Sequence, residues 1–381
     1  MSDFFKKFIP SRRDAVMCFI LIAASVILSF IPPYNNEPSP GTKEKAQVIS
    51  VDNSAVMNMG LLRRGSQLLD VKILSGKYKG QIFRASNELR ANMELDKLFA
   101  EKDIILVGIM HNADPAADTI NAQDYYRINY TVLLFVLFAI LLIIFGGYTG
   151  FSALLSFVFS CLVIWKTVIP LTLAGYNAIG IAFAAVILLS VVIILLVAGL
   201  TRKGSAALAG SILGVLAAAL TGWIFTVLFK INGAIMPYAQ ALLHSGFEHL
   251  SLSDIYIGAI FLSSSGAVMD LAMDIASGIE ELSLHNKDLR FKELLKSGLR
   301  IGRSVVGTMT TTLLLAYSGG YITLMMMFAA QGTSPLDFIN NPHVASEVVK
   351  TLVGSFGLVL VAPLTALVSA LIFGNRKSDS I

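Results

Sequence analysis

The feature of this chain that most constrains its fold is a series of long apolar runs separated by polar segments. A helix that crosses a lipid bilayer needs roughly 20 mostly apolar residues. About eight runs approach or exceed this length, at residues 15–31, 128–145, 151–169, 177–200, 205–229, 254–279, 304–330 and 348–373. Only 14% of the residues are charged, whereas a soluble protein carries about 25%. These properties exclude an ordinary soluble enzyme, a disordered chain and a fibrous repeat, and they predict a polytopic membrane protein.

Positive charge is distributed unevenly over the connections between these runs. Lys and Arg are concentrated at the two ends of the chain and in two of the short connections, whereas the connection 331–347 contains none. The positively charged segments are 1–13, 201–204, 277–303 and 376–381. Because short connections rich in Lys and Arg stay in the cytoplasm, we predict an even number of spans with both termini cytoplasmic. The first run lacks a clear small-x-small cleavage site before Pro32, so we expect a retained signal-anchor rather than a cleaved signal peptide.

Residues 34–127 form the long soluble stretch of the chain and have a mostly β pattern. Strands are predicted at 44–51, 66–74, 80–85 and 103–109, with a short helix at 87–100. Short strands with a basic surface indicate a small OB-like barrel, a fold that often binds nucleic acid or sugars. Because a fold alone does not assign a function, we expect a structural or partner-binding domain and no nucleic acid.

The predicted fold class is thus an all-α polytopic membrane bundle of about eight transmembrane helices. A small, mostly β, OB-like extracytoplasmic domain follows the first helix. The predicted parts are a cytoplasmic N-terminus with the signal-anchor at 1–33, the extracytoplasmic domain at 34–127, the remaining transmembrane helices at 128–375 and a cytoplasmic tail at 376–381.

Two carboxylates interrupt the apolar run at 254–279. Asp270 and Asp274 are four residues apart, a spacing that places them on one face of a helix. Ser263, Gly266 and Ser277 extend this polar face. A carboxylate at membrane depth costs roughly 3 kcal/mol even on mild scales, and such residues are candidates for function by default. We predict that Asp270 has a functional role, whereas for Asp274 a role as a packing group paired with Arg303 remains an equal alternative.

The following run offers a matching set of small and hydroxyl side chains. We expect Thr308, Thr311 and Thr312 to hydrogen-bond to Asp270 or Asp274 across the helix pair. We expect Arg300 and Arg303 to pair with Asp274, Glu280 or Glu281. Gly266 and Gly307 are predicted to let the two helices approach closely, as small residues do in membranes.

The chain resembles the YibE/F-like family of bacterial membrane proteins. The residues that carry this resemblance begin with Gly266-Ala-Val-Met-Asp270-Leu-Ala-Met-Asp274-Ile-Ala-Ser277 and continue with Gly302-Arg303, Gly307-Thr308-Met-Thr310, Leu315-Ala-Tyr-Ser-Gly319-Gly320 and Leu352-Val-Gly354-Ser-Phe-Gly357-Leu-Val-Leu360. The resemblance implies an integral protein of the bacterial cytoplasmic membrane, consistent with a transporter.

A looser resemblance links the same region to the SecD/SecF and RND-type permeases. Gly266 with Asp270, Glu280-Glu281 and Thr311-Thr312-Leu313 are similar to a Gly-x-x-x-Asp helix, its acidic end and a following Thr-Thr-Leu. The resemblance implies that Asp270 lies on a proton pathway. Asp274 is an additional residue, the outer domain is small, and the predicted number of spans exceeds that of one SecF half.

We therefore predict an ion-coupled secondary transporter or permease in which Asp270, assisted by Asp274, binds and releases a proton or sodium ion. The alternative is a non-transporting membrane scaffold that binds a partner through the extracytoplasmic domain. We expect no enzymatic activity, because two carboxylates on one helix are not the two-helix arrangement that shares a proton. We expect no metal or cofactor, and as partners the lipid bilayer, an unknown small solute or ion, and a second copy or a paired family member.

Overall fold

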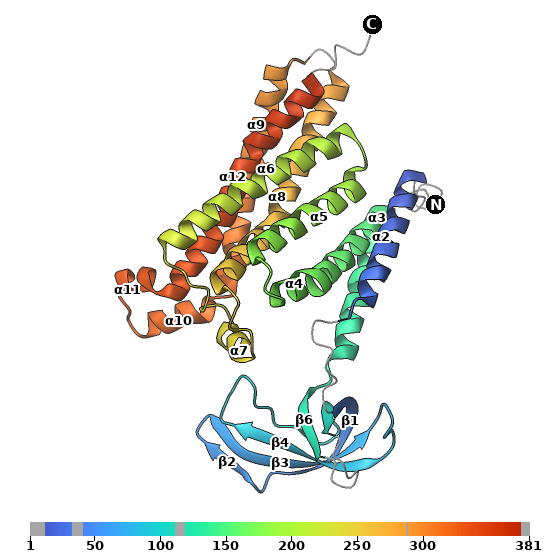
Figure 1. Ribbon diagram of the computed structural model, residues 1–381, viewed down its shortest axis with the longest axis vertical. Helices are drawn as coiled ribbons and strands as arrows, with labels where there is room; N and C mark the ends of the chain where they lie inside the picture. The colour runs from blue at the N-terminus through green and yellow to red at the C-terminus, as the bar shows by residue number, and fades with distance from the viewer. Residues whose placement is uncertain (1–11, 33–40, 111–118, 287–288, 375–381) are drawn as a thin grey trace. The chain divides into compact units, whose positions relative to one another are not determined.

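The computed structural model describes residues 12–32, 41–110, 119–286 and 289–374 (Figure 1). The chain divides into two units, residues 35–141 and the remainder comprising 1–34 and 142–381, and each is described by itself. The predicted tail 376–381 and most of the predicted cytoplasmic N-terminus lie outside the described residues.

The first unit contains a six-stranded β-structure. Its strands are β1 (Gly41–Asp52), β2 (Val56–Met59), β3 (Leu62–Ile73), β4 (Ile82–Arg90), β5 (Ile104–Met110) and β6 (Thr119–Tyr125). β1 pairs antiparallel with both β3 and β5, β3 pairs with β4, and β5 pairs with β6. A parallel bridge between Ser86 of β4 and Asn121 of β6 closes the ring into a barrel. β2 forms a hairpin with β3 outside the ring.

Alternation of apolar residues along the strands explains the barrel. Side chains at every second position point to the same face of a strand. The buried positions follow this period on β1, β3 and β5, and together they form the core: Ala46, Val48, Leu69, Val71, Ile73, Ala85, Phe99, Ile105, Val107, Ile109 and Ile120. The four strands predicted from the sequence are confirmed, while β2 and β6 were not predicted.

The predicted helix at 87–100 is wrong. Its first residues belong to β4, and the segment that follows is irregular. A buried amide pair holds this segment against the barrel, since Gln67 donates to the carbonyl oxygen of Phe99 at 2.9 Å and Asn87 donates to that of Lys97 at 2.7 Å. The helix propensity of the segment is overridden because these tertiary hydrogen bonds satisfy its backbone in another conformation.

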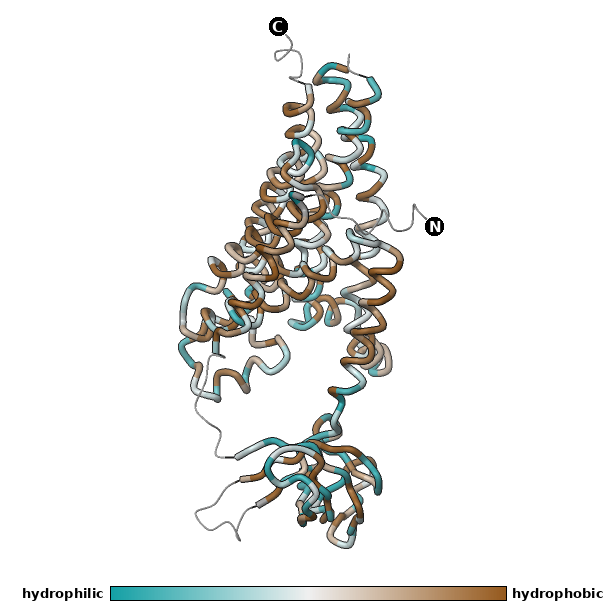
Figure 2. The backbone as a smooth tube through the Cα atoms, turned by 90° about the vertical axis from the view of Figure 1, so that its right-hand side faces the viewer, coloured by the Kyte–Doolittle hydropathy of each residue, from teal (hydrophilic) through white to brown (hydrophobic). Residues whose placement is uncertain are grey.

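The second unit and the adjoining segment are helical. The helices are α2 (Arg12–Phe30), α3 (Ile128–Val163), the π-helical turn η2 (Ile164–Val168), α4 (Ile169–Leu173), α5 (Ala178–Ala198), α6 (Arg202–Leu228), α7 (Ala239–His244), α8 (Leu252–His285), α9 (Phe291–Gly319), α10 (Ile322–Ala330), α11 (Pro335–Asn340) and α12 (Pro342–Gly374). Figure 2 shows that apolar residues dominate the long helices, whereas polar and apolar residues alternate along the barrel strands.

Five helical segments among the described residues are long and apolar enough to cross a membrane. These are Ile128–Leu173, α5, α6, α8 and α12. A sixth is possible if α9 and α10, which meet at an angle of 66°, form one broken span, and the apolar part of α2, Ala15–Phe30, is a shorter helix. The structure thus bears out an apolar helical bundle, and its count of continuous spans is lower than the predicted eight.

The long segment that begins with α3 is interrupted at a glycine. Gly147 has φ 58° and ψ −130°, a backbone conformation outside the helical region that favours glycine. Three residues later, a Cβ atom on Gly150 would overlap the backbone carbonyl oxygen of Leu142. Since residues eight apart in a straight helix lie about 12 Å apart along its axis, the chain changes direction sharply here. The predicted break between the second and third runs is therefore present.

Small residues allow the long helices of the second unit to pack closely. A Cβ on Gly210 of α6 would lie 2.8 Å from Cβ of Thr365 on α12. A Cβ on Gly302 of α9 would lie 2.9 Å from Cβ of Ala362, also on α12. In membranes, where apolar burial does not drive helices together, such close approach supplies the packing energy.

The first helix, α2, is attached to later helices by polar contacts as well as packing. Sγ of Cys18 lies 2.8 Å from the hydroxyl of Tyr148, and Leu21 is buried against Phe159 and Val163. At the end of α2, Nζ of Lys166 donates to the carbonyl oxygen of Ile31 at 2.6 Å. This helix is thus an integrated part of its unit.

Candidate functional site

Helix α8 has two faces of opposite character. Val268, Leu271 and Ile275 are completely buried among α6, α9 and α12. On the opposite face, Asp270 and Asp274 are exposed. Ser263 and Gly266 are also exposed and follow the same helical spacing, so the polar stripe predicted from the sequence forms one continuous surface, called here the acidic face.

Neither carboxylate of the acidic face is neutralised by a neighbouring side chain. Among the described residues, no hydrogen bond and no ion pair reaches Asp270 or Asp274, and Arg303 is exposed without pairing to Asp274. The other predicted acidic partners are engaged elsewhere, since Glu280 pairs with Lys203 at 3.4 Å and Glu281 with His285 at 3.5 Å. The predicted pairing of Arg303 with Asp274 is therefore not formed.

The threonines of α9 hydrogen-bond to their own helix. Thr308 donates to the carbonyl oxygen of Val305 at 3.0 Å, and Thr312 donates to that of Thr308 at 3.1 Å. Thr311 makes a long bond to the carbonyl oxygen of Gly307 at 3.5 Å. The predicted hydrogen bonds from these threonines to the aspartates are absent from the described structure, because a hydroxyl in a helix readily finds the carbonyl one turn earlier.

The predicted packing role of Gly266 and Gly307 is also corrected. Both glycines are exposed, and a Cβ on either would meet nothing within 4 Å. Close approach of α8 and α9 occurs instead at Gly278, where a Cβ would lie 2.6 Å from Cδ1 of Ile301, and at Gly298, where it would lie 2.6 Å from Cδ1 of Ile279. Gly266 therefore leaves the acidic face open rather than covering it.

A chain of polar contacts leads from the acidic face to α12. The hydroxyl of Tyr317 on α9 donates to Oγ of Ser263 at 3.3 Å. Nζ of Lys350 on α12 lies 5.1 Å from the centre of the Tyr317 ring, within the range of a cation–π contact. The same ammonium lies 3.8 Å from Oε1 of Glu347. These four residues join three helices through polar groups.

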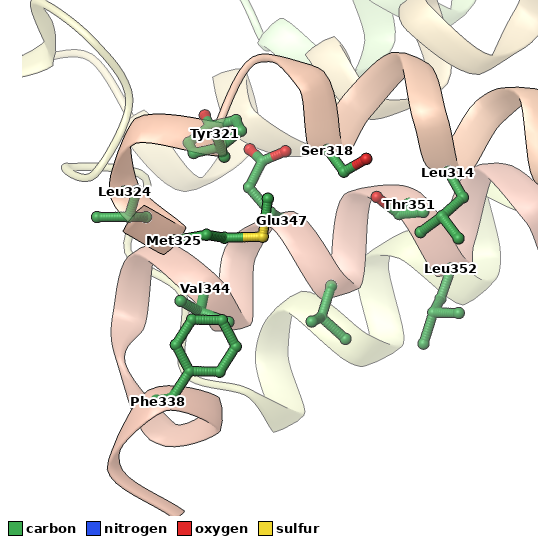
Figure 3. A pocket seen from close by; sticks show the side chains of 11 residues that line it. Leu314, Ser318, Tyr321, Leu324, Met325, Phe338, Val344, Glu347, Thr351 and Leu352 are labelled. Carbon is green, nitrogen blue, oxygen red and sulfur yellow. The ribbon is translucent and has the colours of Figure 1, made fainter. Parts of the chain in front are cut away.

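Glu347 lies between two cavities near the bend that separates α9 from α10. One cavity of about 270 Å³ is mainly apolar, and the other, of about 320 Å³, also includes Lys350 and Tyr256 in its lining. Figure 3 shows the carboxylate between the side chains of Tyr321 and Ser318. Its Oε2 is buried and has no hydrogen-bond partner among the described residues.

Comparison with known families covers nearly all of the chain. The family described as YibE/F-like protein matches residues 134–375, which is more than half of the sequence. The chain belongs to the YibE/F family. The YibE/F family N-terminal domain matches residues 41–125, the range of the barrel strands β1 to β6. No curated protein and no solved structure matches the chain.

The two family matches separate the molecule in the same way as its secondary structure. In this YibE/F protein the N-terminal match ends at the last barrel strand, and the second match begins within α3. The acidic face, Glu347 and Lys350 all lie within the second match. The resemblance inferred from the residues around Asp270 is thereby confirmed at the level of the family.

Neither Glu347 nor Lys350 belongs to the ion-coupling residues predicted from the sequence. Glu347 ends the predicted connection 331–347, and Lys350 lies just inside the last predicted apolar run. In the structure α12 begins at Pro342, so both residues belong to a helix that packs against α8 and α9. A lysine within a predicted span was the available signal, because ionisable residues in such spans mark functional sites.

Proposed function

We propose that this YibE/F protein is an ion-coupled secondary transporter or permease of a bacterial cytoplasmic membrane. The observation that supports the proposal is the acidic face of α8, where Asp270 and Asp274 lie on an apolar helix without a protein partner among the described residues. Asp270 would bind and release a proton or a sodium ion, with Asp274 assisting. The exposed face of α9, with Arg303, Thr308, Thr311 and Thr312, would line the same pathway.

The energetic argument starts from the unsatisfied charge. An ionised carboxylate facing lipid costs roughly 3 kcal/mol or more, and two of them one turn apart also repel each other. This cost is reduced if the face borders water, binds a cation or takes up a proton. Coupling to an ion gradient requires a pair of carboxylates that exists in both cation-bound and cation-free forms. A purely structural pair would instead be matched by arginine or hydroxyl donors.

We propose eight spans with both termini on the cytoplasmic side. Seven of the spans would be α2, α5, α6, α8, the broken pair α9–α10, α12 and the part of α3 that precedes Gly147. The eighth would comprise the rest of α3 with η2 and α4. The segment Ile128–Leu173 has 46 residues and would measure about 69 Å as one straight helix, roughly twice the thickness of the hydrocarbon core. Two spans joined at the Gly147 break fit a bilayer.

Replacement of Asp270 tests the coupling role. Proteoliposomes containing the full chain would be given an inward gradient of protons or of ²²Na⁺, and cation uptake would be measured. We expect Asp270→Asn to abolish the protein-dependent uptake while keeping the normal amount of folded protein. Asp254→Asn, in the first turn of the same helix, serves as the matched control and should transport normally. Unchanged uptake by Asp270→Asn would refute the coupling role.

A second candidate is a partner-binding membrane subunit. It is favoured by the β2–β3 hairpin of the barrel, where Met57, Met59 and Leu61 are 63%, 58% and 87% exposed. The ring order β1-β3-β4-β6-β5 also resembles an OB-type barrel, whose loops and faces commonly bind ligands. If this candidate is correct, replacing the three residues by Ser would abolish partner binding, and the wild-type chain itself would show no protein-dependent cation uptake. Unchanged partner binding by the Ser variant would refute the role of this hairpin.

A further inference from the structure

We propose that Glu347 is the outer cation-binding carboxylate of the transport path and exchanges a monovalent cation with the acidic face of α8 by way of Tyr317 and Ser263. This inference rests on the proposed function and on the proposed topology, in which α12 begins on the extracytoplasmic side. It adds a second binding position, on a different helix from Asp270.

The first step concerns the state of the Glu347 carboxylate. Its side chain is 16% exposed, and Oε2 is buried without a donor among the described residues. The ammonium of Lys350 lies 3.8 Å from the other oxygen, a separation that gives an ion pair but exceeds hydrogen-bond length. The hydroxyl of Tyr321 interacts with the same carboxylate, but no described donor meets full hydrogen-bond geometry at Oε2. Because a buried acceptor without a full donor is costly, Oε2 has a place for a cation or a proton.

The second step is the broken helix beside this carboxylate. The axes of α9 and α10 meet at 66°, with Gly319 and Gly320 at the break. At the break, backbone amides donate to the carbonyl oxygen three residues earlier. The amide of Gly320 donates to the carbonyl oxygen of Tyr317 at 3.2 Å, and the amide of Tyr321 donates to the carbonyl oxygen of Ser318 at 3.1 Å. Helices interrupted within membranes supply carbonyl oxygens and helix ends to bound ions. Tyr321, at this break, lines both cavities together with Glu347, so the carboxylate lies beside the interruption.

The third step connects Glu347 with the acidic face. Lys350 contacts both Glu347 and the ring of Tyr317, and the hydroxyl of Tyr317 donates to Ser263 at 3.3 Å. Ser263 lies on the acidic face seven residues before Asp270, which corresponds to about 10 Å along the axis of α8. Polar groups thus extend from Glu347 toward Asp270 along the junction of α8, α9 and α12.

The charge balance indicates which kind of cation fits. Among the residues that line the two cavities beside Glu347, this residue supplies the one carboxylate, and Lys350 already offsets part of its charge. Divalent cations are held by several carboxylate and carbonyl oxygens, so this site is too weakly charged for them. A proton or a sodium ion requires one negative charge. When the cation leaves, the ammonium of Lys350 remains as the counter-charge of Glu347.

Carbodiimide labelling tests the site without knowledge of the transported solute. Dicyclohexylcarbodiimide modifies protonated carboxyl groups in apolar surroundings, and mass spectrometry of peptides locates the modified residue. The wild-type full chain in proteoliposomes would be labelled at acidic and alkaline pH, with and without sodium chloride. We expect modification of Glu347 well above that of Asp337, an exposed control carboxylate on α11. If the bound ion is sodium, sodium chloride should suppress the modification of Glu347. If the bound ion is a proton, alkaline pH alone should suppress this modification.

Variants then connect the site to transport. Glu347→Gln should lose the uptake of protons or ²²Na⁺, whereas Asp337→Asn should retain it. The proposal is overturned if Glu347 is modified no more than Asp337, if neither cation affects its modification, or if Glu347→Gln transports normally. Failure of the proposed role of Asp270 is distinguishable, because Asp270→Asn would then transport normally while labelling of Glu347 and its suppression by the cation persisted.

Discussion

A single glycine on α6 determines how closely this helix approaches α12. Gly210 is buried, and a Cβ at this position would overlap Oγ1 of Thr365 and lie 2.9 Å from its Cα. The neighbouring backbone cannot move aside as a flexible side chain would. The contact is therefore sensitive to the addition of one methyl group.

We predict that Gly210→Ala destabilises the folded protein by about 1–3 kcal/mol through overpacking. The measurement is the thermal unfolding midpoint of the purified full chain in detergent. Gly307→Ala is the matched control, because a Cβ there meets nothing within 4 Å. Its midpoint should be unchanged or slightly raised by the better helix propensity of alanine. Equal midpoints for the two variants would contradict the packing seen between α6 and α12.

At the residue scale, sequence periodicity located the acidic face but not the partners of its residues. The spacing of Asp270 and Asp274 fixes their common face because helix geometry is the same in every context. Whether Thr308 or Arg303 reaches them depends on the rotation of α9 about its own axis. That rotation follows from packing at Gly298 and Gly302, which a single sequence does not distinguish from exposed glycines such as Gly307.

At the scale of the elements, Asp124 of the last barrel strand forms two ion pairs, one of them with the irregular segment after β4. Asp124 lies 3.1 Å from Nζ of Lys97 and 2.8 Å from a guanidinium nitrogen of Arg127. Burial raises the pKa of Asp124, but hydrogen bonds from Arg127 and Lys97 and the charge of Lys97 outweigh it, so the net pKa lies below its usual value. The folded state thus favours the ionised form.

We predict that these contacts stabilise the barrel at neutral pH by about 0.5–1 kcal/mol, since partly exposed pairs are screened by solvent. A depressed folded-state pKa gives stability that is present above the unfolded value of about 3.9 and is lost as the pH falls through the folded value. Amide exchange in the barrel of the full chain should therefore be faster in Asp124→Asn than in wild type at neutral pH. The exchange rates of Asp124→Asn and wild type should converge in acid. Glu101→Gln is the control variant, and its exchange should match that of wild type at neutral and at acidic pH.

The segment after β4 shows where element prediction failed. Local propensity favours a helix over residues 87–100, but the amides of Gln67 and Asn87 bind its carbonyl groups from neighbouring strands. Gln67 lies 32 residues from Phe99 in the sequence, so no local window contains both partners. The strands β1, β3, β4 and β5 were predictable because their alternating apolar residues provide a local signal.

At the scale of the whole molecule, the proposed eight spans assign each connection to one side of the membrane. In a background with Cys18 and Cys161 replaced by Ser, single cysteines would report on this assignment through an impermeant maleimide added to intact cells. We predict labelling of Leu61→Cys and Thr333→Cys, and protection of Thr149→Cys and Glu281→Cys until the membrane is opened. Leu61, Thr149 and Glu281 are exposed in the structure, and Thr333 is half-buried. Labelling of Glu281→Cys from outside would contradict the proposed topology.

The apolar character of the whole bundle was predictable, whereas its continuity was not. Apolar runs locate α5, α6, α8 and α12 because each exceeds the length that a bilayer requires. The break between α9 and α10 fell within one predicted run, since Gly319-Gly320 and its surroundings remain apolar. Glu347 acquires its place in the candidate site from this break and from the contacts of α12.

The attachment of α2 has a consequence for the time course of synthesis. Its terminal carbonyl group accepts a hydrogen bond from Lys166, which follows Ile31 by 135 residues. At about 5–20 residues per second, a ribosome needs roughly 7–27 s to make that stretch. Throughout this interval the carbonyl group of Ile31 and the thiol of Cys18 lack their partners, because Lys166 and Tyr148 have not yet been synthesised. Lipid, water or the insertion machinery must occupy their places until Tyr148 and Lys166 arrive.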